Sequence, residues 1–119
     1  MNKEFLKKYL NTDSPSTFEV GAQKVWIEQV SKYSDMIESD NFGNVFAYKK
    51  SLNDNIDRYR VVIDAHCDEI GWVVSSIDSD GFLRVKRNGG TDNEITPSTN
   101  VKILTDSGKK IKGVFGKLK

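Results

Sequence analysis

Cysteine, histidine and proline are scarce in this chain of 119 residues, which contains 1 Cys, 1 His and 2 Pro. The single thiol, Cys67, cannot form a disulfide within the chain, so packing, a partner or a metal must hold the fold. No apolar stretch approaches the roughly 20 residues of a membrane-spanning helix, and the charged start of the chain does not resemble a signal peptide. We therefore expect a cytoplasmic protein without a membrane partner.

The composition is that of a globular protein, but the charge is unevenly distributed. Hydrophobic residues make up 37% of the chain and charged residues 29%, which is typical of one compact unit or slightly more. Residues 1–81 contain 9 Lys/Arg against 14 Asp/Glu, whereas residues 82–119 contain 9 against 3. A basic segment can bind nucleic acid, but Lys and Arg also protect exposed hairpins from mispairing. Because no exposed aromatics alternate with the lysines, we favour hairpins and expect no nucleic-acid partner.

Two helices are predicted near the start of the chain. Apolar side chains at helical spacing favour a short amphipathic helix over residues 3–10. Ser16 and Glu19 have the spacing of a capping box, which predicts that a second helix starts there. The second helix is expected to bury one stripe of apolar residues at three- and four-residue steps: Phe18, Ala22, Val25, Trp26, Val30 and Tyr33.

Strand patterns begin near residue 41. Residues 42–48 predict a strand, and a polar loop follows it. Residues 60–65 contain an apolar run without alternation, which is expected for a strand covered on both faces. The sequence therefore predicts an α/β layer with residues 60–65 as its central strand.

The pattern changes near residue 71 and is all β from there on. Strands are predicted over residues 72–77, 82–87, 101–105 and 111–115. Asp80 and Gly81 between two of these strands favour a primed hairpin turn, and Trp72 and Phe82 are expected in the core. A small barrel or sandwich is the expected architecture of this second part.

The only histidine follows the predicted central strand, at the kind of strand end where sites form in α/β sheets. With a two-residue period, His66 and Asp68 project to the same side and Cys67 points away. This suits a metal-binding imidazole whose tautomer a carboxylate fixes. Such a pair is also common as a purely structural contact, and a catalytic zinc needs about three protein ligands. Cys67 is interpreted as a small hydrophobe rather than a redox sensor.

Several motifs carry a resemblance to a known family. Residues 65–71, Ala-His-Cys-Asp-Glu-Ile-Gly, resemble the Ala-His-x-Asp-Glu-Ile-Gly signature of the glutamyl aminopeptidase and cellulase-M family of dinuclear metallopeptidases. Residues 40–45 resemble the Asp-x-x-Gly-Asn-Val strand entry of that family, and residues 14–19 resemble its amino-terminal loop and helix start. Further landmarks of its inserted β-domain are similar to residues 80–83, 89–90 and 113–116.

The resemblance implies an α/β fold in two parts. Residues 1–70 would be the amino-terminal part of the catalytic domain, and residues 71–119 the start of an inserted β-barrel-like domain used in homo-oligomer assembly. His66 would bind one of two divalent metal ions, zinc or cobalt, and Asp68 would orient this histidine. The substrate would be a peptide, hydrolysed at its amino-terminal residue.

In this family the remaining metal ligands and the catalytic base lie beyond the inserted domain, inside which this chain stops. We therefore expect the 119 residues alone to bind metal poorly and to lack peptidase activity. The alternative is a small β-rich binding or assembly module in which His66 is structural.

Overall fold

The computed structural model describes residues 2–52, 59–92, 94 and 96–116. The chain divides into two compact units, Met1–Gly71 and Trp72–Lys119. The strands of the described residues pair as three separate two-stranded sheets. None of the helices in this part of the chain is long and apolar enough to cross a bilayer. The assignment of the two units to a catalytic and an inserted domain stays a prediction.

The first helix, α1, spans Lys3–Leu10, as the sequence predicts. The Asn2 side chain caps it by accepting a hydrogen bond from the Phe5 amide at 3.1 Å. Glu4 lies in the first turn and Lys7 and Lys8 in the last, where their charges complement the helix dipole.

The second helix, α2, spans Val20–Val30 and starts later than the capping box predicted. Its N-cap residue, Glu19, makes no capping hydrogen bond with its side chain. The Ser16 hydroxyl instead donates to Asp68, and the Glu19 carboxylate accepts from the Thr17 amide. The capping-box prediction is therefore wrong because the serine is used by a segment far along the chain.

The apolar stripe of α2 is only partly covered. Ala22 is fully buried and is the one buried hydrophobic residue among those that the structure describes. Phe18 and Tyr33, which flank the helix, are 62% and 64% exposed. Much of the stripe that was expected to be buried therefore still faces solvent.

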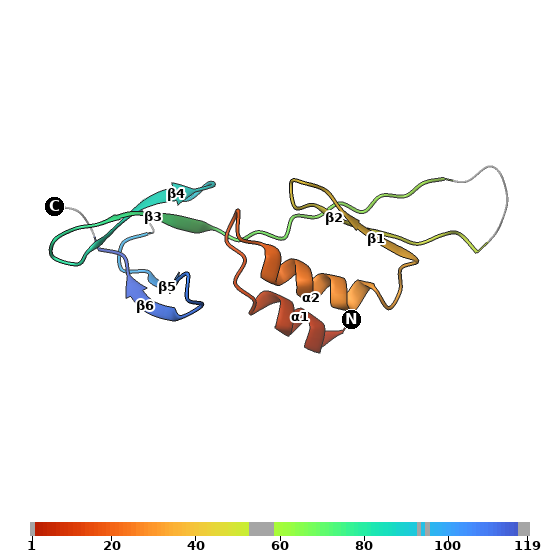
Figure 1. Ribbon diagram of the computed structural model, residues 1–119, viewed down its shortest axis with the longest axis horizontal. Helices are drawn as coiled ribbons and strands as arrows, with labels where there is room; N and C mark the ends of the chain where they lie inside the picture. Colours follow the sequence, from red (N-terminus) through yellow and green to blue (C-terminus); the bar gives the residue numbers. More distant parts are fainter. Residues whose placement is uncertain (1, 53–58, 93, 95, 117–119) are drawn as a thin grey trace. The chain divides into compact units, whose positions relative to one another are not determined.

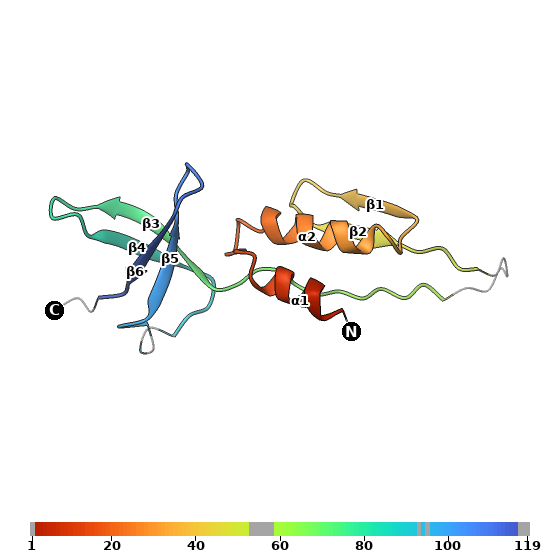
Figure 2. The ribbon, with the colours of Figure 1, turned by 90° about the horizontal axis from the view of Figure 1, so that it is seen from below.

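A β-hairpin completes the first unit. Strand β1, Met36–Ser39, runs antiparallel to β2, Val45–Tyr48, with Ile37 opposite Ala47. Only β2 was predicted. In Figure 1 α2 is drawn between α1 and the hairpin, and in Figure 2 it overlaps β2. The Gln23 side chain of α2 donates to the Gly43 carbonyl in the hairpin turn.

The predicted central strand over residues 60–65 is wrong. The structure assigns no strand there, and Val61, Val62 and Ile63 are 82%, 85% and 92% exposed. A strand needs a hydrogen-bonded neighbour, and no described segment pairs with these residues. The apolar pattern is present, but the described chain supplies no neighbouring strands.

From Gly71 onward the structure contains the predicted strands, shifted by a residue at some ends: β3 (Gly71–Ile77), β4 (Leu83–Asn88), β5 (Asn100–Leu104) and β6 (Lys110–Val114). They form the pairs β3–β4 and β5–β6 (Figure 2). The Trp72 ring packs on Phe115 with centroids 4.6 Å apart, whereas Phe82 is 68% exposed and so is not the core residue predicted. The described strands do not close into one barrel.

All three hairpins use the same turn. The first turn residue donates its amide to the carbonyl of the fifth, and a glycine at the fourth position has φ of +78° to +87°. This is a type I turn followed by a left-handed glycine, so the primed turn predicted at Asp80 and Gly81 is wrong. The turns begin at Asp40, Asp78 and Thr105.

Candidate functional site

The candidate site lies in the first unit, where two distant segments meet. Pro15 and Glu69 form an isolated parallel β-bridge. The Glu69 amide donates to the Ser14 carbonyl at 2.9 Å, and the Ser16 amide donates to the Glu69 carbonyl at 3.2 Å. These backbone hydrogen bonds hold residues 66–70 against residues 13–16.

The end of α1 directs the chain into this contact. The side chains of Asn11 and Thr12 donate to the Lys7 and Lys8 carbonyls at 2.7 and 2.8 Å, so the last turn of the helix has partners for its free carbonyls. The chain then leaves the helix toward Pro15.

Ser14 fastens the two segments together with its own polar groups. Its hydroxyl donates to the Cys67 carbonyl at 3.0 Å, and its amide donates to the Glu69 carboxylate at 2.9 Å. Ser14 is 6% exposed, so water competes little with these hydrogen bonds.

The structure brings together the two predicted site residues. His66 Nδ1 lies 2.8 Å from Asp68 Oδ1, and the Ser16 hydroxyl donates to Asp68 Oδ2 at 2.6 Å. An ionised carboxylate can only accept hydrogen bonds, so the hydrogen between His66 and Asp68 is carried by His66 Nδ1. The lone pair of the neutral imidazole then lies on Nε2. The imidazole is 85% exposed, which leaves Nε2 open to a ligand.

Hydrogen bonds and burial set the charge of the neighbouring groups. The hydrogen bond from Ser16, and next that from His66, holds the pKa of Asp68 below its usual range. Asp68 is therefore a carboxylate at neutral pH. Burial raises the pKa of the Cys67 thiol, and the negative charges of Glu19 and Asp68 raise it further, so the thiol stays protonated.

A hollow of about 240 Å³ adjoins these residues. It combines an apolar wall from the end of α1 with the polar groups of residues 66–69. Its lining is Tyr9, Leu10, Thr12, Ser14, His66, Cys67, Asp68 and Glu69.

The residues present fit one position of a metal site. An imidazole whose Nδ1 is bound to a carboxylate presents Nε2 in the manner of a metal ligand. A catalytic zinc needs about three protein ligands, and no group of three or more His, Cys, Asp or Glu side chains suited to a metal occurs in the described part of the chain. The described residues therefore offer one imidazole of this kind and not a complete zinc site.

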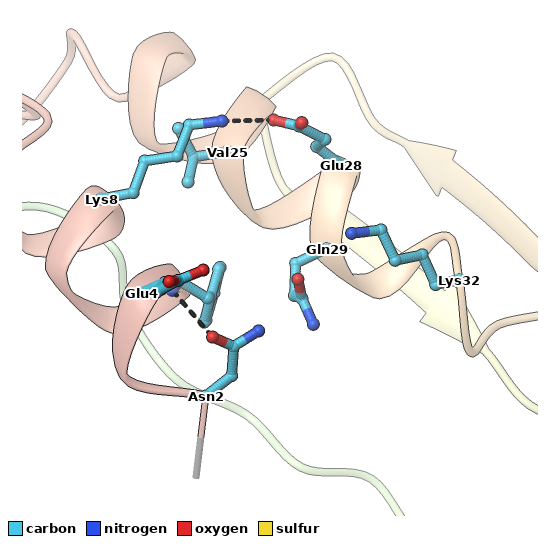
Figure 3. A pocket seen from close by; sticks show the side chains of 8 residues that line it. Asn2, Glu4, Lys8, Val25, Glu28, Gln29 and Lys32 are labelled. Carbon is cyan, nitrogen blue, oxygen red and sulfur yellow. Dashed lines mark hydrogen bonds and ion pairs between the residues drawn. The ribbon is translucent and has the colours of Figure 1, made fainter.

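A second hollow, of about 210 Å³, lies between α1 and α2 (Figure 3). Figure 3 shows Lys8 pointing at Glu28, and the two are joined by an ion pair of 2.6 Å. That hydrogen bond lowers the pKa of Glu28. Both side chains are more than half exposed, so this surface lacks the burial of a catalytic site.

Sequence reasoning missed the roles of Ser14, Ser16 and Glu69 in the site. The local spacing of Ser16 and Glu19 satisfied a helix-start rule, and nothing local indicates a partner more than 50 residues away. The resemblance of residues 14–19 to a family motif was the one signal that this loop mattered.

Comparisons with known proteins find that the chain is similar to aminopeptidases. Residues 43–119 match the family model described as M42 glutamyl aminopeptidase. The chain is 31% identical over 116 residues to lysyl aminopeptidase of Pyrococcus furiosus. Among solved structures, aminopeptidase APDkam598 of Desulfurococcus kamchatkensis is similar over 95% of this chain, with 33% identity and a TM-score of 0.86. PhTET1-12s, a dodecamer in its asymmetric unit, is similar over the whole chain, with 28% identity and a TM-score of 0.79.

These relatives are much longer than the chain. The matched region covers 97% of this chain but 32% of the Pyrococcus furiosus protein, and 31% and 35% of the two solved chains. The chain thus spans about a third of the length of the relatives that it matches.

Proposed function

The chain belongs to the M42 glutamyl aminopeptidase family, and we propose that it forms the amino-terminal part of a longer metal-dependent aminopeptidase. The observation that carries this proposal is the family match over residues 43–119, which contains His66 and Asp68 in hydrogen-bond contact. The chain covers about a third of its relatives and buries one hydrophobic residue among those described. Both facts agree with a part whose remaining core lies elsewhere.

In this proposal His66 is a metal ligand and Asp68 orients it. Asp68 Oδ1 holds the hydrogen on Nδ1, which directs the Nε2 lone pair outward. The complete enzyme would hold two divalent ions, zinc or cobalt, with the other ligands supplied outside residues 1–119. When bound, such ions activate water for attack on a peptide carbonyl near neutral pH.

The proposed substrates are peptides, hydrolysed at the amino-terminal residue. The Pyrococcus furiosus relative is named for lysyl substrates and the family model for glutamyl substrates. The residue preference therefore differs within the group and is not part of the proposal.

The second unit is proposed as the start of an inserted β-barrel-like domain, residues 71–119, that contributes to a homo-oligomer. Two-stranded sheets leave unpaired strand edges, which favour association with further strands. PhTET1-12s, a similar structure, is a dodecamer. The cytoplasmic location expected from the sequence stays a prediction.

The proposal is tested by comparing the 119-residue chain with the product of the complete reading frame that contains it. We expect zinc- or cobalt-dependent release of amino-terminal residues from peptides by the longer product alone. His66→Ala should abolish the release, and Asp68→Asn should reduce it by about 10- to 100-fold. Asp80→Asn, in a turn of the second unit, is the control and should leave it unchanged.

Two results would contradict the proposal. One is full activity of the longer product carrying His66→Ala. The other is metal-dependent release by the purified 119-residue chain that His66→Ala abolishes, because the chain would then contain a complete site.

A further inference from the structure

The Asp68 carboxylate is held from both sides. Oδ1 faces His66 Nδ1 at 2.8 Å, and Oδ2 accepts the Ser16 hydroxyl at 2.6 Å. Because each oxygen has its own partner, the carboxylate cannot rotate toward other groups without breaking both hydrogen bonds. The orientation that meets His66 therefore depends on Ser16.

Little else restrains the imidazole. The His66 side chain is 85% exposed, so packing contributes little to where the imidazole points. The hydrogen bond to Asp68 is thus the contact that selects the hydrogen position on the ring.

Ser16 is itself placed by backbone contacts. Its amide donates to the Glu69 carbonyl at 3.2 Å, next to the bridge between Pro15 and Glu69. The following residue, Thr17, has φ of +72°, and its amide is bound by the Glu19 carboxylate. The serine hydroxyl therefore starts from a fixed backbone position beside Asp68.

Joining the two segments does not require the Ser16 hydroxyl. The backbone bridge and Ser14, whose hydroxyl donates to the Cys67 carbonyl, already connect them. The Ser16 hydroxyl adds a hydrogen bond to a charged group that itself contacts the imidazole. The Ser16 hydroxyl can therefore act on the imidazole through Asp68.

We propose that Ser16 is a positioning residue of the candidate site: its hydroxyl fixes the Asp68 carboxylate against His66 Nδ1, which keeps Nε2 as the ligand atom. This inference rests on the proposed function for the identity of the ligand, a divalent metal ion. The selection of the tautomer itself is a property of this chain without metal.

The experiment uses the full chain labelled with nitrogen-15, whose single histidine gives one set of ring signals. Long-range proton–nitrogen correlation spectra at pH 8 report the ratio of Nδ1–H to Nε2–H tautomers. We expect Ser16→Ala to lower this ratio by about fivefold, the effect of one ordinary hydrogen bond. Ser16→Thr keeps a hydroxyl and should restore it.

Ser14→Ala is the matched control. It also removes a serine hydroxyl that joins the same two segments, but this hydroxyl binds the Cys67 carbonyl and not Asp68. Because the Pro15–Glu69 bridge and the Ser14 amide still join the segments, Ser14→Ala should leave the tautomer ratio unchanged. An unchanged ratio in Ser16→Ala, or an equal change in Ser14→Ala, would overturn the proposal.

A zinc titration followed by the same ring signals adds a second readout. We expect Ser16→Ala to weaken the binding of Zn²⁺ at His66 by about tenfold and Ser16→Thr to restore it. If the tautomer ratio shifts as expected but Zn²⁺ never reaches Nε2 in the wild-type chain or the longer product, the proposed metal role fails. The positioning of the ring by Ser16 would then stand without it.

Discussion

Gly71 lies so close to Pro15 that a Cβ added to the glycine would stand 2.7 Å from the proline Cβ. The proline atom belongs to a rigid ring, so only a movement of the backbone relieves such a contact. The missing side chain at residue 71 therefore permits the approach of the two segments that form the candidate site.

Gly71→Ala should weaken this approach. Overpacking of this kind costs about 1–3 kcal/mol of stability. The contact between residues 13–16 and 66–70 should be the part of the chain that is destabilised. Hydrogen exchange of the Glu69 and Ser16 amides, which donate across it, measures the free energy of opening. Gly90→Ala is the control, since an added Cβ there meets nothing within 4 Å. Equal exchange in the two variants would contradict the role of Gly71.

Thr17→Gly should stabilise the chain. Thr17 has φ of +72°, a left-handed conformation that a β-branched residue adopts only with strain. Glycine relieves the strain but adds freedom to the unfolded chain. We expect a net increase of about 0.5–1 kcal/mol in the free energy of unfolding, measured by urea denaturation. Thr17→Ala keeps a Cβ and should show little of this gain, so an equal gain from alanine would refute the explanation by strain.

The β1–β2 hairpin should loosen in acid. The side-chain hydrogen bond from Asn44, followed by backbone amides, lowers the pKa of Asp40 from its ordinary value of 3.8. The pKa of Asp40 is lower in the folded chain than in the unfolded chain. Asp40 therefore contributes its full stabilisation to the hairpin above pH 3.8, and this contribution is lost as the pH falls through the pKa of the folded chain. Exchange of the Asn44 amide, which donates to Asp40 at 2.9 Å, should accelerate in that window, after correction for the intrinsic pH dependence.

The Asp40→Ala variant should lack this pH dependence and show a more open turn at every pH. Asp80→Ala removes a turn aspartate whose carboxylate accepts no hydrogen bond from the described residues, so it should keep the wild-type profile. An Asn44 amide whose corrected exchange is the same at pH 6 and pH 3 would argue against Asp40 as the holding group.

Cys67 should react slowly with iodoacetamide. Its pKa is raised by burial first and then by the charges of Glu19 and Asp68, and only the thiolate is an effective nucleophile. The alkylation rate at pH 8 should be lower in the folded chain than in urea. Glu19→Gln removes one negative charge but keeps an acceptor for the Thr17 amide, and it should accelerate the reaction. Glu38→Gln, on β1, is the control and should not change the alkylation rate. A folded chain that reacts as fast as the unfolded one would contradict this account.

Local sequence patterns predicted the elements whose contacts are local. Helix α1 has its stripe, its cap and its charges within a few residues, and its predicted bounds are confirmed. The strands of the second unit are confirmed to within a residue or so because each pairs with a strand adjacent to it along the chain, β3 with β4 and β5 with β6. The common turn is also encoded locally, since Asp40, Asp78 and Thr105 each precede a glycine by three residues, but the turn type predicted at Asp80 and Gly81 was wrong.

Two errors arose where a distant partner decides the outcome. Residues 60–65 have a strand pattern, but the described chain offers them no partner strand, and Ser16 left its capping role for a carboxylate 52 residues away. For the site, the pairing of His66 with Asp68 followed from the two-residue period, whereas the contributions of Ser14 and Ser16 depend on a long-range contact. Strand β1 was missed because its four residues carry no clear alternation.

The segments that meet at the Pro15–Glu69 bridge are joined by hydrogen bonds between residues 52 to 55 positions apart. A loop of that length must close before any of these bonds forms, whereas α1 and the hairpins need only neighbouring residues. During refolding the Ser16 hydroxyl should therefore reach Asp68, the carboxylate that contacts the imidazole, after the helices and turns have formed. In rising denaturant this contact should be the earliest to separate, which makes the lone histidine a late-stage reporter of folding in the first unit.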